Sequence, residues 1–340
     1  MRSSIFSSDA PSGRRWQGAW LIAALLAASI CTGLEAHWRA LGYRPQLQDS
    51  AQLWSMQRAR VDTSRRIPLV VLGASHIQYA LDMKLLAQRL PDYRPIMLAD
   101  NGRYPLAALR DLAADEDFRG IVLCDIDARG LSSYYDDMQQ PAVEYFHKQW
   151  SPNWYVHRKA LNLWQRTAVI AWSRFGALAT LERWIAAGPA PWRSPTTLRT
   201  DRSGDIDFSA ADGAALARGF LDGLRADLHR HPPQSPALWR ANLERVRRWC
   251  DRIHSRGGQV VFLRTPTSGA LAAAEEAAYP RSRYWDRLAD AVGVPVVYAA
   301  DIPFFANLTL HDGSHVDYHD KPAYTRALVD LLQSRGWVRR

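Results

Sequence analysis

Three side chains that can cooperate in nucleophilic catalysis stand near opposite ends of the sequence. Ser75 follows the apolar run IPLVVLG, residues 67–73, whereas Asp312 and His315 are spaced i, i+3 in the segment HDGSHVDYHD. A serine hydroxyl is a weak nucleophile and needs an oriented histidine as its base, and a carboxylate can hold that histidine through the other ring nitrogen. The three residues are therefore the parts of a triad with the chain order serine, aspartate, histidine.

Each of these residues also has a purely structural interpretation. A serine after a strand-terminal glycine commonly caps a turn or a helix, and Asp312 or Ser314 is suited to capping the helix that follows. Because the two motifs occur together at the two ends of one α/β pattern, the balance favours a triad.

The histidines of HDGSHVDYHD raise a metal-site alternative. His311, His315 and His319 recur every four residues, which would place them on one face of a helix. Gly313 and Val316 disfavour a continuous helix there, and no HExxH signature is present. We therefore expect no metal and no cofactor, and keep a metal-dependent hydrolase as a minor alternative.

The elements that would position these residues alternate between strand and helix. Apolar strand-like runs cover residues 67–73, 94–99 and 119–127, with helical patterns at 81–90 and 105–115. The alternation returns with helical patterns at 236–257, 282–293 and 321–336 and strand-like runs at 258–266 and 294–301. This order predicts an α/β fold with a parallel sheet covered by helices on both faces. Ligands of such sheets bind at the carboxyl ends of the strands, where Ser75, Asn101, Asp125 and Thr265 fall.

The chain begins with a membrane-anchor pattern. Between Arg15 and Glu35 lie nineteen uncharged residues, WQGAWLIAALLAASICTGL, which as a helix span about 28 Å. Arg2, Arg14 and Arg15 precede them, so the positive-inside rule predicts a cytoplasmic tail (1–15), a single membrane span (16–38) and an exported domain (39–340). A cleavable signal peptide is the alternative, but a clear small-x-small cleavage site is missing.

The rest of the composition sets limits on partners. The net charge of +9 comes from arginines scattered among acids, without a basic block or an aromatic RNA-binding motif, and we expect no nucleic-acid partner. Three cysteines cannot form a disulfide framework, although a Cys124–Cys250 pair stays open. Residues 130–235 form an aromatic-rich insertion that includes a helical pattern at 167–188; it is either a substrate wall or a helical excursion with its own small core.

The two end motifs resemble those of the SGNH (GDSL-type) hydrolase superfamily. Gly73-Ala74-Ser75-His76 is similar to its nucleophile block and Asp312-Gly313-Ser314-His315 to its C-terminal Asp-x-x-His block. The resemblance implies a three-layer, flavodoxin-like sheet, with Gly102 as an oxyanion donor beside the Ser75 amide. The family's asparagine after the third strand is absent, because Asp125 and Asp127 occupy that segment.

This departure affects the oxyanion site, because an aspartate offers acceptors where donors are needed. Asn101, from the neighbouring loop, is the expected substitute. We further interpret His76, Asp125, Asp127 and Arg264 as candidate lining residues of the substrate site.

The closest branch by resemblance is the group of membrane-anchored polysaccharide O-acetyltransferase-like proteins. It implies a serine-dependent acyl, mainly O-acetyl, transferase or esterase at a bacterial inner membrane, with its main domain in the periplasm. The implied partners are a polysaccharide or other O-acylated substrate, the membrane through the N-terminal helix, and a polysaccharide synthesis or acetylation complex. The alternative is a non-catalytic SGNH-like accessory protein that binds a glycan or a membrane partner, which the missing asparagine favours.

Overall fold

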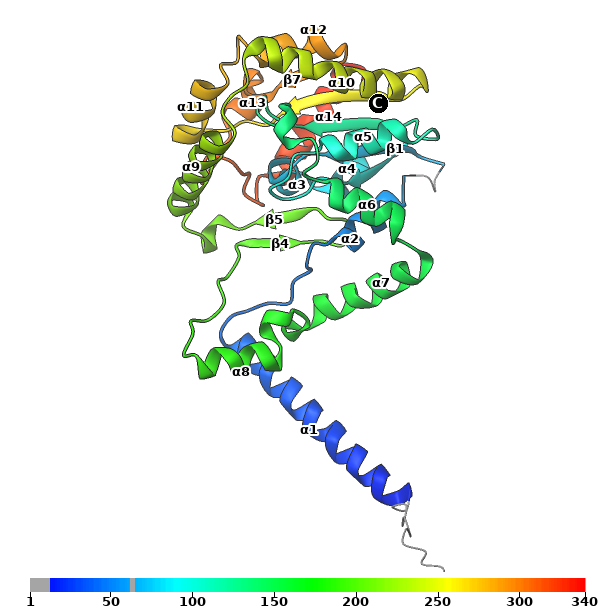
Figure 1. The fold of residues 1–340 in the computed structure, drawn as a ribbon, viewed down its shortest axis with the longest axis vertical. Coiled ribbons are helices and arrows are strands. Elements are labelled where there is room, and N and C mark those ends of the chain that lie inside the picture. Colours follow the sequence, from blue (N-terminus) through cyan, green and yellow to red (C-terminus); the bar gives the residue numbers. More distant parts are fainter. Residues whose placement is uncertain (1–12, 62–64, 340) are drawn as a thin grey trace, which may run out of the picture. The chain divides into compact units, whose positions relative to one another are not determined.

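A computed structural model describes residues 13–61 and 65–339, which fold into two compact units (Figure 1). One unit combines Met1–Gln48 with Leu161–Arg193, and the other combines Asp49–Ala160 with Ser194–Arg340. Most of the predicted tail (1–15) lies outside the described residues. In the first of these units, Trp38 and Tyr43 share a small core with Val169 and Phe175.

The larger unit is built on a five-stranded parallel sheet. Its strands run in the order β2-β1-β3-β6-β7 and are β1 (Ile67–Leu72), β2 (Tyr93–Met97), β3 (Ile121–Asp125), β6 (Gln259–Arg264) and β7 (Val296–Tyr298). The register pairs Val71 with Met97 on one side and Leu123 on the other. This is the flavodoxin-type order, and it confirms the predicted α/β fold.

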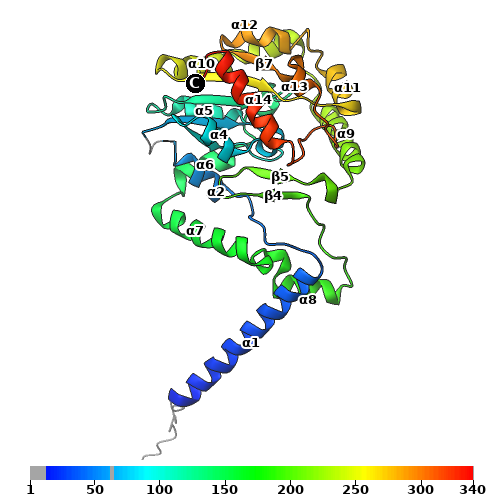
Figure 2. The ribbon, with the colours of Figure 1, turned by 180° about the vertical axis from the view of Figure 1, so that it is seen from behind.

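Helices cover both faces of the sheet, which explains why the strands are apolar throughout. Val70, Leu72, Val122 and Cys124 point into one core and Leu69, Val71 and Leu123 into the other. The first core is closed by α5 (Leu106–Ala114), α10 (Pro236–Ser255) and α12 (Leu288–Val292), and the second by α3 (Ser75–Ala80), α4 (Met83–Arg89) and α14 (Lys321–Ser334). Figure 2 shows α4 and α14 in front of the sheet. Cys124 and Cys250 lie buried in the first core as free thiols.

The remaining elements of the larger unit surround this framework. They are α2 (Ala51–Arg58), η1 (Ser133–Tyr135), α6 (Gln140–Lys148), the antiparallel strands β4 (Thr196–Leu198) and β5 (Gly204–Ile206), η4 (Phe208–Ala210), α9 (Gly213–Arg230), α11 (Gly269–Ala278), η5 (Trp285–Arg287), η6 (Ala299–Asp301) and α13 (Pro303–Ala306). The helix α7 (Pro152–Thr167) contributes residues to both units.

The hairpin β4–β5 buttresses the helix that begins at Ser75. Tyr79 of α3 forms a small buried cluster with Ile206 and Phe208. A Cβ on Gly204 would lie 2.3 Å from the Tyr79 ring, so only glycine permits this approach. Lys321, at the start of α14, donates a 2.8 Å hydrogen bond to Asp205. The hairpin therefore ties α3 to α14.

The smaller unit contains the N-terminal apolar helix α1 (Gly13–Ala40). Among the described residues, Trp16–Ala40 is the one helix long and apolar enough to cross a membrane by length and composition, and its apolar window is unburied. The helix predicted at 167–188 is wrong over its first half: the structure has the short turns η2 (Val169–Ala171) and η3 (Ser173–Phe175), and only α8 (Ala177–Ile185) is an α-helix. Backbone N–H groups of Val169 and Ile170 donate instead to Glu35.

Candidate active site

Ser75 lies at the carboxyl end of the sheet, where β1 passes into α3. The turn depends on Gly73, whose φ is +152°; a Cβ there would lie 2.5 Å from Ile77 Cγ2 and 3.0 Å from the Asp125 carbonyl oxygen. Glycine is therefore required for this close approach between the first and third strands. Gln139, which is fully buried, donates 3.1 Å hydrogen bonds to the carbonyl groups of both Gly73 and Arg103. It fixes the Ser75 loop against the loop after β2.

His315 is placed beside Ser75 by the loop that precedes α14. The distance from His315 Nε2 to Ser75 Oγ is 2.8 Å, although 240 residues separate them in sequence. The other ring nitrogen, Nδ1, lies 2.8 Å from Asp312 Oδ2. In the neutral histidine with the proton on Nδ1, Nε2 is free to accept the serine proton.

Backbone N–H groups of its own loop stabilise the ionised form of Asp312. Its Oδ1 accepts backbone N–H groups from Ser314 and His315, at 2.9 and 2.7 Å, which leaves Oδ2 for the imidazole. Burial opposes the negative charge, but the hydrogen bonds and the His315 ring hold the pKa of Asp312 below its usual value. A carboxylate that stays ionised can orient the histidine and stabilise its protonated form.

His76 lies next to this group and points into the same site. Its Nε2 is 2.5 Å from Ser314 Oγ, and its ring centroid lies 5.3 Å from that of His315. Burial and the neighbouring His315 lower the pKa of His76 to about 3. His76 therefore stays neutral at physiological pH, so that it does not compete with His315 for a proton.

The loop after β2 supplies the candidate oxyanion donors. Gly102 has a φ of +72° and its α-carbon faces open space, while Asn101 directs its side-chain nitrogen to within 3.4 Å of the Tyr79 hydroxyl. The Ser75 amide belongs to the first turn of α3, where N–H groups have no partner within the helix. Ser75, Asn101 and Gly102 all line one cavity.

The two aspartates after β3 make internal contacts. Asp125 accepts hydrogen bonds from the Thr265 backbone N–H (2.9 Å) and from its hydroxyl (3.3 Å). Asp127 accepts from the Tyr104 hydroxyl at 2.8 Å and from the Gly130 backbone. In its ionised form, neither aspartate supplies the donor that an asparagine would give at this edge of the sheet.

Burial raises the pKa of Asp125 to about 7, despite the two hydrogen bonds from Thr265. A raised native pKa means that stability is lost as the pH rises from about 4 through 7, by up to about 4 kcal/mol. We expect Asp125→Asn to reduce the decrease in stability between pH 5 and pH 8. The guanidinium denaturation midpoints at these two pH values would measure it. Asp290→Asn, at an exposed position, is the control; a wild-type decline that persists in Asp125→Asn would contradict the assignment.

The cavity that Ser75 and His315 line has a volume of about 390 Å³. Every sequence-predicted site residue except Asp312 lines it: Ser75, His76, Asn101, Gly102, Asp125, Asp127, Arg264 and His315. Asp312 is 1% exposed and stands behind His315. The opposite wall is α9, from the insertion, whose Phe220 ring lies 5.2 Å from the His315 ring.

Two glycines keep part of the α9 wall free of side chains, although Phe220 and Leu224 of the same helix also line the cavity. Gly219 and Gly223 line the cavity one helical turn apart, and a Cβ at either position would meet no atom within 4 Å. Glycine inside a helix is about 1 kcal/mol less favourable than alanine. These two residues therefore make α9 less stable but leave the cavity larger.

We expect Gly223→Leu to leave the protein folded, with an unchanged or higher Tm, while it narrows the cavity. Hydrolysis of p-nitrophenyl butyrate should fall by roughly 10-fold or more relative to p-nitrophenyl acetate, a typical steric effect in a pocket. Arg225→Leu, on the exposed side of the same helix, is the matched control. Equal losses for both esters would contradict a steric role for this wall.

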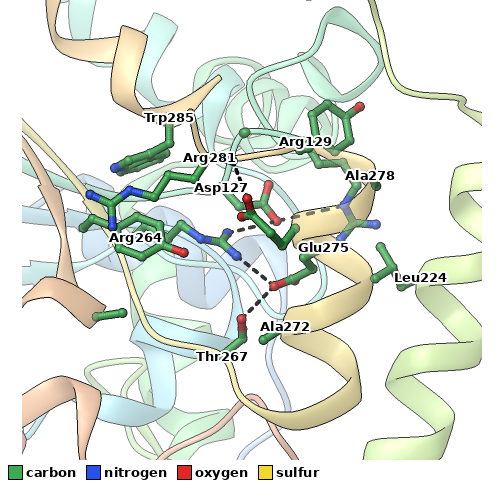
Figure 3. A pocket seen from close by; sticks show the side chains of 15 residues that line it. Asp127, Arg129, Leu224, Arg264, Thr267, Ala272, Glu275, Ala278, Arg281 and Trp285 are labelled. Atoms are coloured by element: carbon green, nitrogen blue, oxygen red, sulfur yellow. Dashed lines mark hydrogen bonds and ion pairs between the residues drawn. The ribbon is translucent and has the colours of Figure 1, made fainter. Parts of the chain in front are cut away.

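A second cavity, shown in Figure 3, has a volume of about 230 Å³ and adjoins the first. The two share Asp127, Arg129, Leu224, Arg264 and Glu275. In the shared wall, Arg264 binds Glu275 at 2.8 Å and lies 3.8 Å from Asp127. Arg264 was expected to line the substrate site; it lines both cavities, and its charge is taken up by internal ion pairs.

The far side of the second cavity is aromatic. Tyr279, Trp285 and Tyr298 line it, and Arg281 stacks over the Tyr298 ring at 4.1 Å. Arg281 in turn pairs with Asp286 and Asp301. Aromatic rings beside neutralised charges offer a ligand both apolar contact and hydrogen-bonding groups.

The remaining residues of HDGSHVDYHD serve other contacts. His319 Nδ1 lies 2.6 Å from Asp317 and its side chain is 66% exposed, while His311 packs against the Phe208 ring. Within residues 13–61 and 65–339, no group of three or more histidine, cysteine, aspartate or glutamate side chains is arranged to hold a metal ion.

Several site residues carry little signal in the sequence. Gln139, Phe220 and Ser314 lie in segments whose role depends on distant partners. The glycine pair at 219 and 223 is the one sequence signal for the α9 wall. Two glycines at helical spacing indicate a helix face without side chains.

Fold and site together define an α/β protein with a hydrogen-bonded serine–histidine–aspartate chain at the carboxyl edge of a flavodoxin-type sheet. The sequence matches no known family profile and no curated protein. Among solved structures it is similar to the crystal structure of TesA, with 13% identity and a TM-score of 0.35 over 78% of this chain and 98% of that one.

Proposed function

We propose that the protein is an SGNH-type serine acyl transferase or esterase. The observation that carries this proposal is the unbroken chain from Ser75 Oγ through His315 to Asp312, with both hydrogen bonds at 2.8 Å. These are the distances that general-base activation of a serine needs. They support a catalytic function over the alternative of a binding-only accessory protein.

In the proposed reaction, Ser75 Oγ attacks the carbonyl carbon of an acyl ester while His315 Nε2 takes the hydroxyl proton. Asp312 stabilises the resulting imidazolium through Nδ1. The oxyanion is received by the backbone N–H groups of Ser75 and Gly102, with the Asn101 amide as the side-chain donor. Collapse of the tetrahedral intermediate breaks the ester bond, and the leaving alkoxide takes the proton from His315. Water or a second hydroxyl then attacks the acyl-serine by the same steps in reverse.

For the substrate, we propose an O-acylated, mainly O-acetylated, glycan of the cell envelope. A small acyl group fits beside Ser75 in the first cavity, and a sugar ring suits the adjoining second cavity. That cavity combines the rings of Tyr279, Trp285 and Tyr298 with ion-paired groups, which favours a polyhydroxylated ligand without a strong charge. The contiguous cavities thus support an acyl donor and an alcohol acceptor held side by side.

For the location, we propose a single-pass protein of a bacterial inner membrane. The apolar helix Trp16–Ala40 supports an anchor, and the arginines before it support a cytoplasmic N-terminus with the larger unit in the periplasm. A fixed enzyme of this kind would act beside a polysaccharide synthesis or acetylation complex.

The proposal is tested by labelling the detergent-purified full chain with a fluorophosphonate probe and mapping the modified residue by mass spectrometry. We expect one adduct, on Ser75, and protection from it by p-nitrophenyl acetate. The ester is then incubated with the protein and an added oligosaccharide, and the oligosaccharide is analysed by mass spectrometry. An acetylated oligosaccharide indicates a transferase, whereas release of acetate alone indicates an esterase. A folded protein that takes up no probe would overturn the proposed catalysis.

A further inference from the structure

The smaller unit holds a short segment against one end of the apolar helix α1. Glu35 accepts backbone N–H groups from Val169 and Ile170, at 3.0 and 3.1 Å. Trp38 donates a 3.1 Å hydrogen bond to the Phe175 carbonyl, and both side chains are buried. Residues 168–193, hereafter the interfacial segment, are therefore fixed at the place where the uncharged stretch of α1 ends.

The interfacial segment exposes a row of large apolar side chains on α8. Leu178, Leu181, Trp184 and Ile185 are between 51% and 78% exposed. Leu178, Leu181 and Ile185 follow the i, i+3, i+7 spacing of one helix face, whereas Thr180 is buried. Trp184 also contacts His37 of α1, with ring centroids 5.8 Å apart. The apolar face of α8 is thus continuous with the end of α1.

Three arginines of the same segment carry charge without an acidic partner. Arg174 stacks over Trp172 at 4.3 Å, Arg183 over Trp38 at 5.4 Å and Arg193 over Tyr43 at 5.3 Å. Within the part of the chain that the structure describes, none of the three forms an ion pair with a carboxylate. With Glu182 as its one acidic residue, the segment has three positive charges and one negative charge.

We infer that the interfacial segment lies in the surface of the membrane that α1 spans, with α8 parallel to that surface and its arginines on anionic phospholipid headgroups. Large apolar and aromatic side chains beside arginines are the composition of interfacial helices, and cations near an anionic lipid surface are attracted to it. The positive charge of the interfacial segment, and the continuity of its apolar face with α1, favour lipid over a second protein chain as the binding partner. This inference rests on the proposed membrane anchoring and adds a second, shallow attachment.

The test places one fluorophore at a time in the full chain, in a Cys31→Ala background where the remaining Cys124 and Cys250 are buried. The protein is reconstituted in phosphatidylcholine vesicles with or without phosphatidylglycerol. Leu181→Cys reports on α8, Leu25→Cys on the middle of the uncharged stretch, and Arg247→Cys, on the half-exposed side of α10, serves as the control. Each cysteine carries an NBD fluorophore. The measurement is the quenching of NBD fluorescence by lipids that carry a quencher at a shallow or a deep position of the acyl chain.

We expect shallow quenching at residue 181, deep quenching at residue 25 and none at residue 247. The double variant Arg174→Gln, Arg183→Gln should lose the increase in quenching at residue 181 that phosphatidylglycerol gives. Deep quenching at residue 25 without quenching at residue 181 would overturn the inference and leave the anchor intact. Absence of quenching at both positions would overturn the anchor as well. A blue shift at residue 181 that depends on protein concentration and not on lipid would assign the face to a second copy of the chain.

Discussion

Replacing Ser75 with alanine is expected to reduce the turnover of p-nitrophenyl acetate by about a million-fold relative to wild type, as for other serine nucleophiles. Among the residues that the structure describes, no other hydroxyl is bonded to the His315 ring, so water would have to attack directly. The fold should be unchanged, because Ser75 occupies the first turn of α3 and its side chain is only partly buried. The measurement is initial rate together with fluorophosphonate labelling and near-UV circular dichroism.

Ser314→Ala is the matched control for this prediction. Ser314 lines the same cavity and its hydroxyl contacts His76 instead of His315. We expect a loss of at most roughly 10-fold and intact labelling, because one neutral hydrogen bond contributes about 1 kcal/mol. If labelling survived in Ser75→Ala and disappeared in Ser314→Ala, the nucleophile would be Ser314.

Asp312→Asn is expected to lower kcat by roughly 10⁴-fold while preserving the loop. The two backbone N–H groups bond Oδ1, which an asparagine keeps as its amide oxygen, whereas Oδ2 faces His315 Nδ1. An amide nitrogen at that position donates to Nδ1 and drives the ring proton to Nε2. The histidine then presents a hydrogen to Ser75 and can no longer accept one.

A second aspartate–histidine pair in the same segment provides the control. Asp317 Oδ1 lies 2.6 Å from His319 Nδ1 and also accepts the His319 backbone N–H, but neither residue lines the cavity beside Ser75. Asp317→Asn should change kcat by only a few-fold. A comparable fall in both variants, at equal stability, would show that the loss follows from loop distortion and not from the histidine tautomer.

The sheet and the two ends of the site were predictable because their signals are local. Each strand is a short apolar run bounded by turn residues, and the gap between Ser75 and His315 does not matter once both lie at the carboxyl edge of one parallel sheet. Gly73 stands at the end of the first apolar run, whereas Gly102 was expected only from the resemblance. Both adopt a positive φ, which favours glycine.

The remaining parts were not predictable because they depend on contacts between distant segments. Residues 167–176 have a helical pattern, yet Glu35 and Trp38 bind their backbone groups and hold them in short turns. Similarly, the glycine pair at 219 and 223 marks a clear helix face, but nothing in the insertion indicated that this face of α9 would lie opposite His315. Tertiary contacts of this kind override local propensity.

The order of the site residues along the sequence has a consequence for synthesis. A ribosome completes β1 and Ser75 well before His315, which lies 240 residues later, and before the helix α14. Under the proposed mechanism, a nascent chain that has not yet reached His315 holds an unactivated serine and is expected not to cleave esters. A fragment that ends near residue 310 should likewise leave other esters in the cell intact.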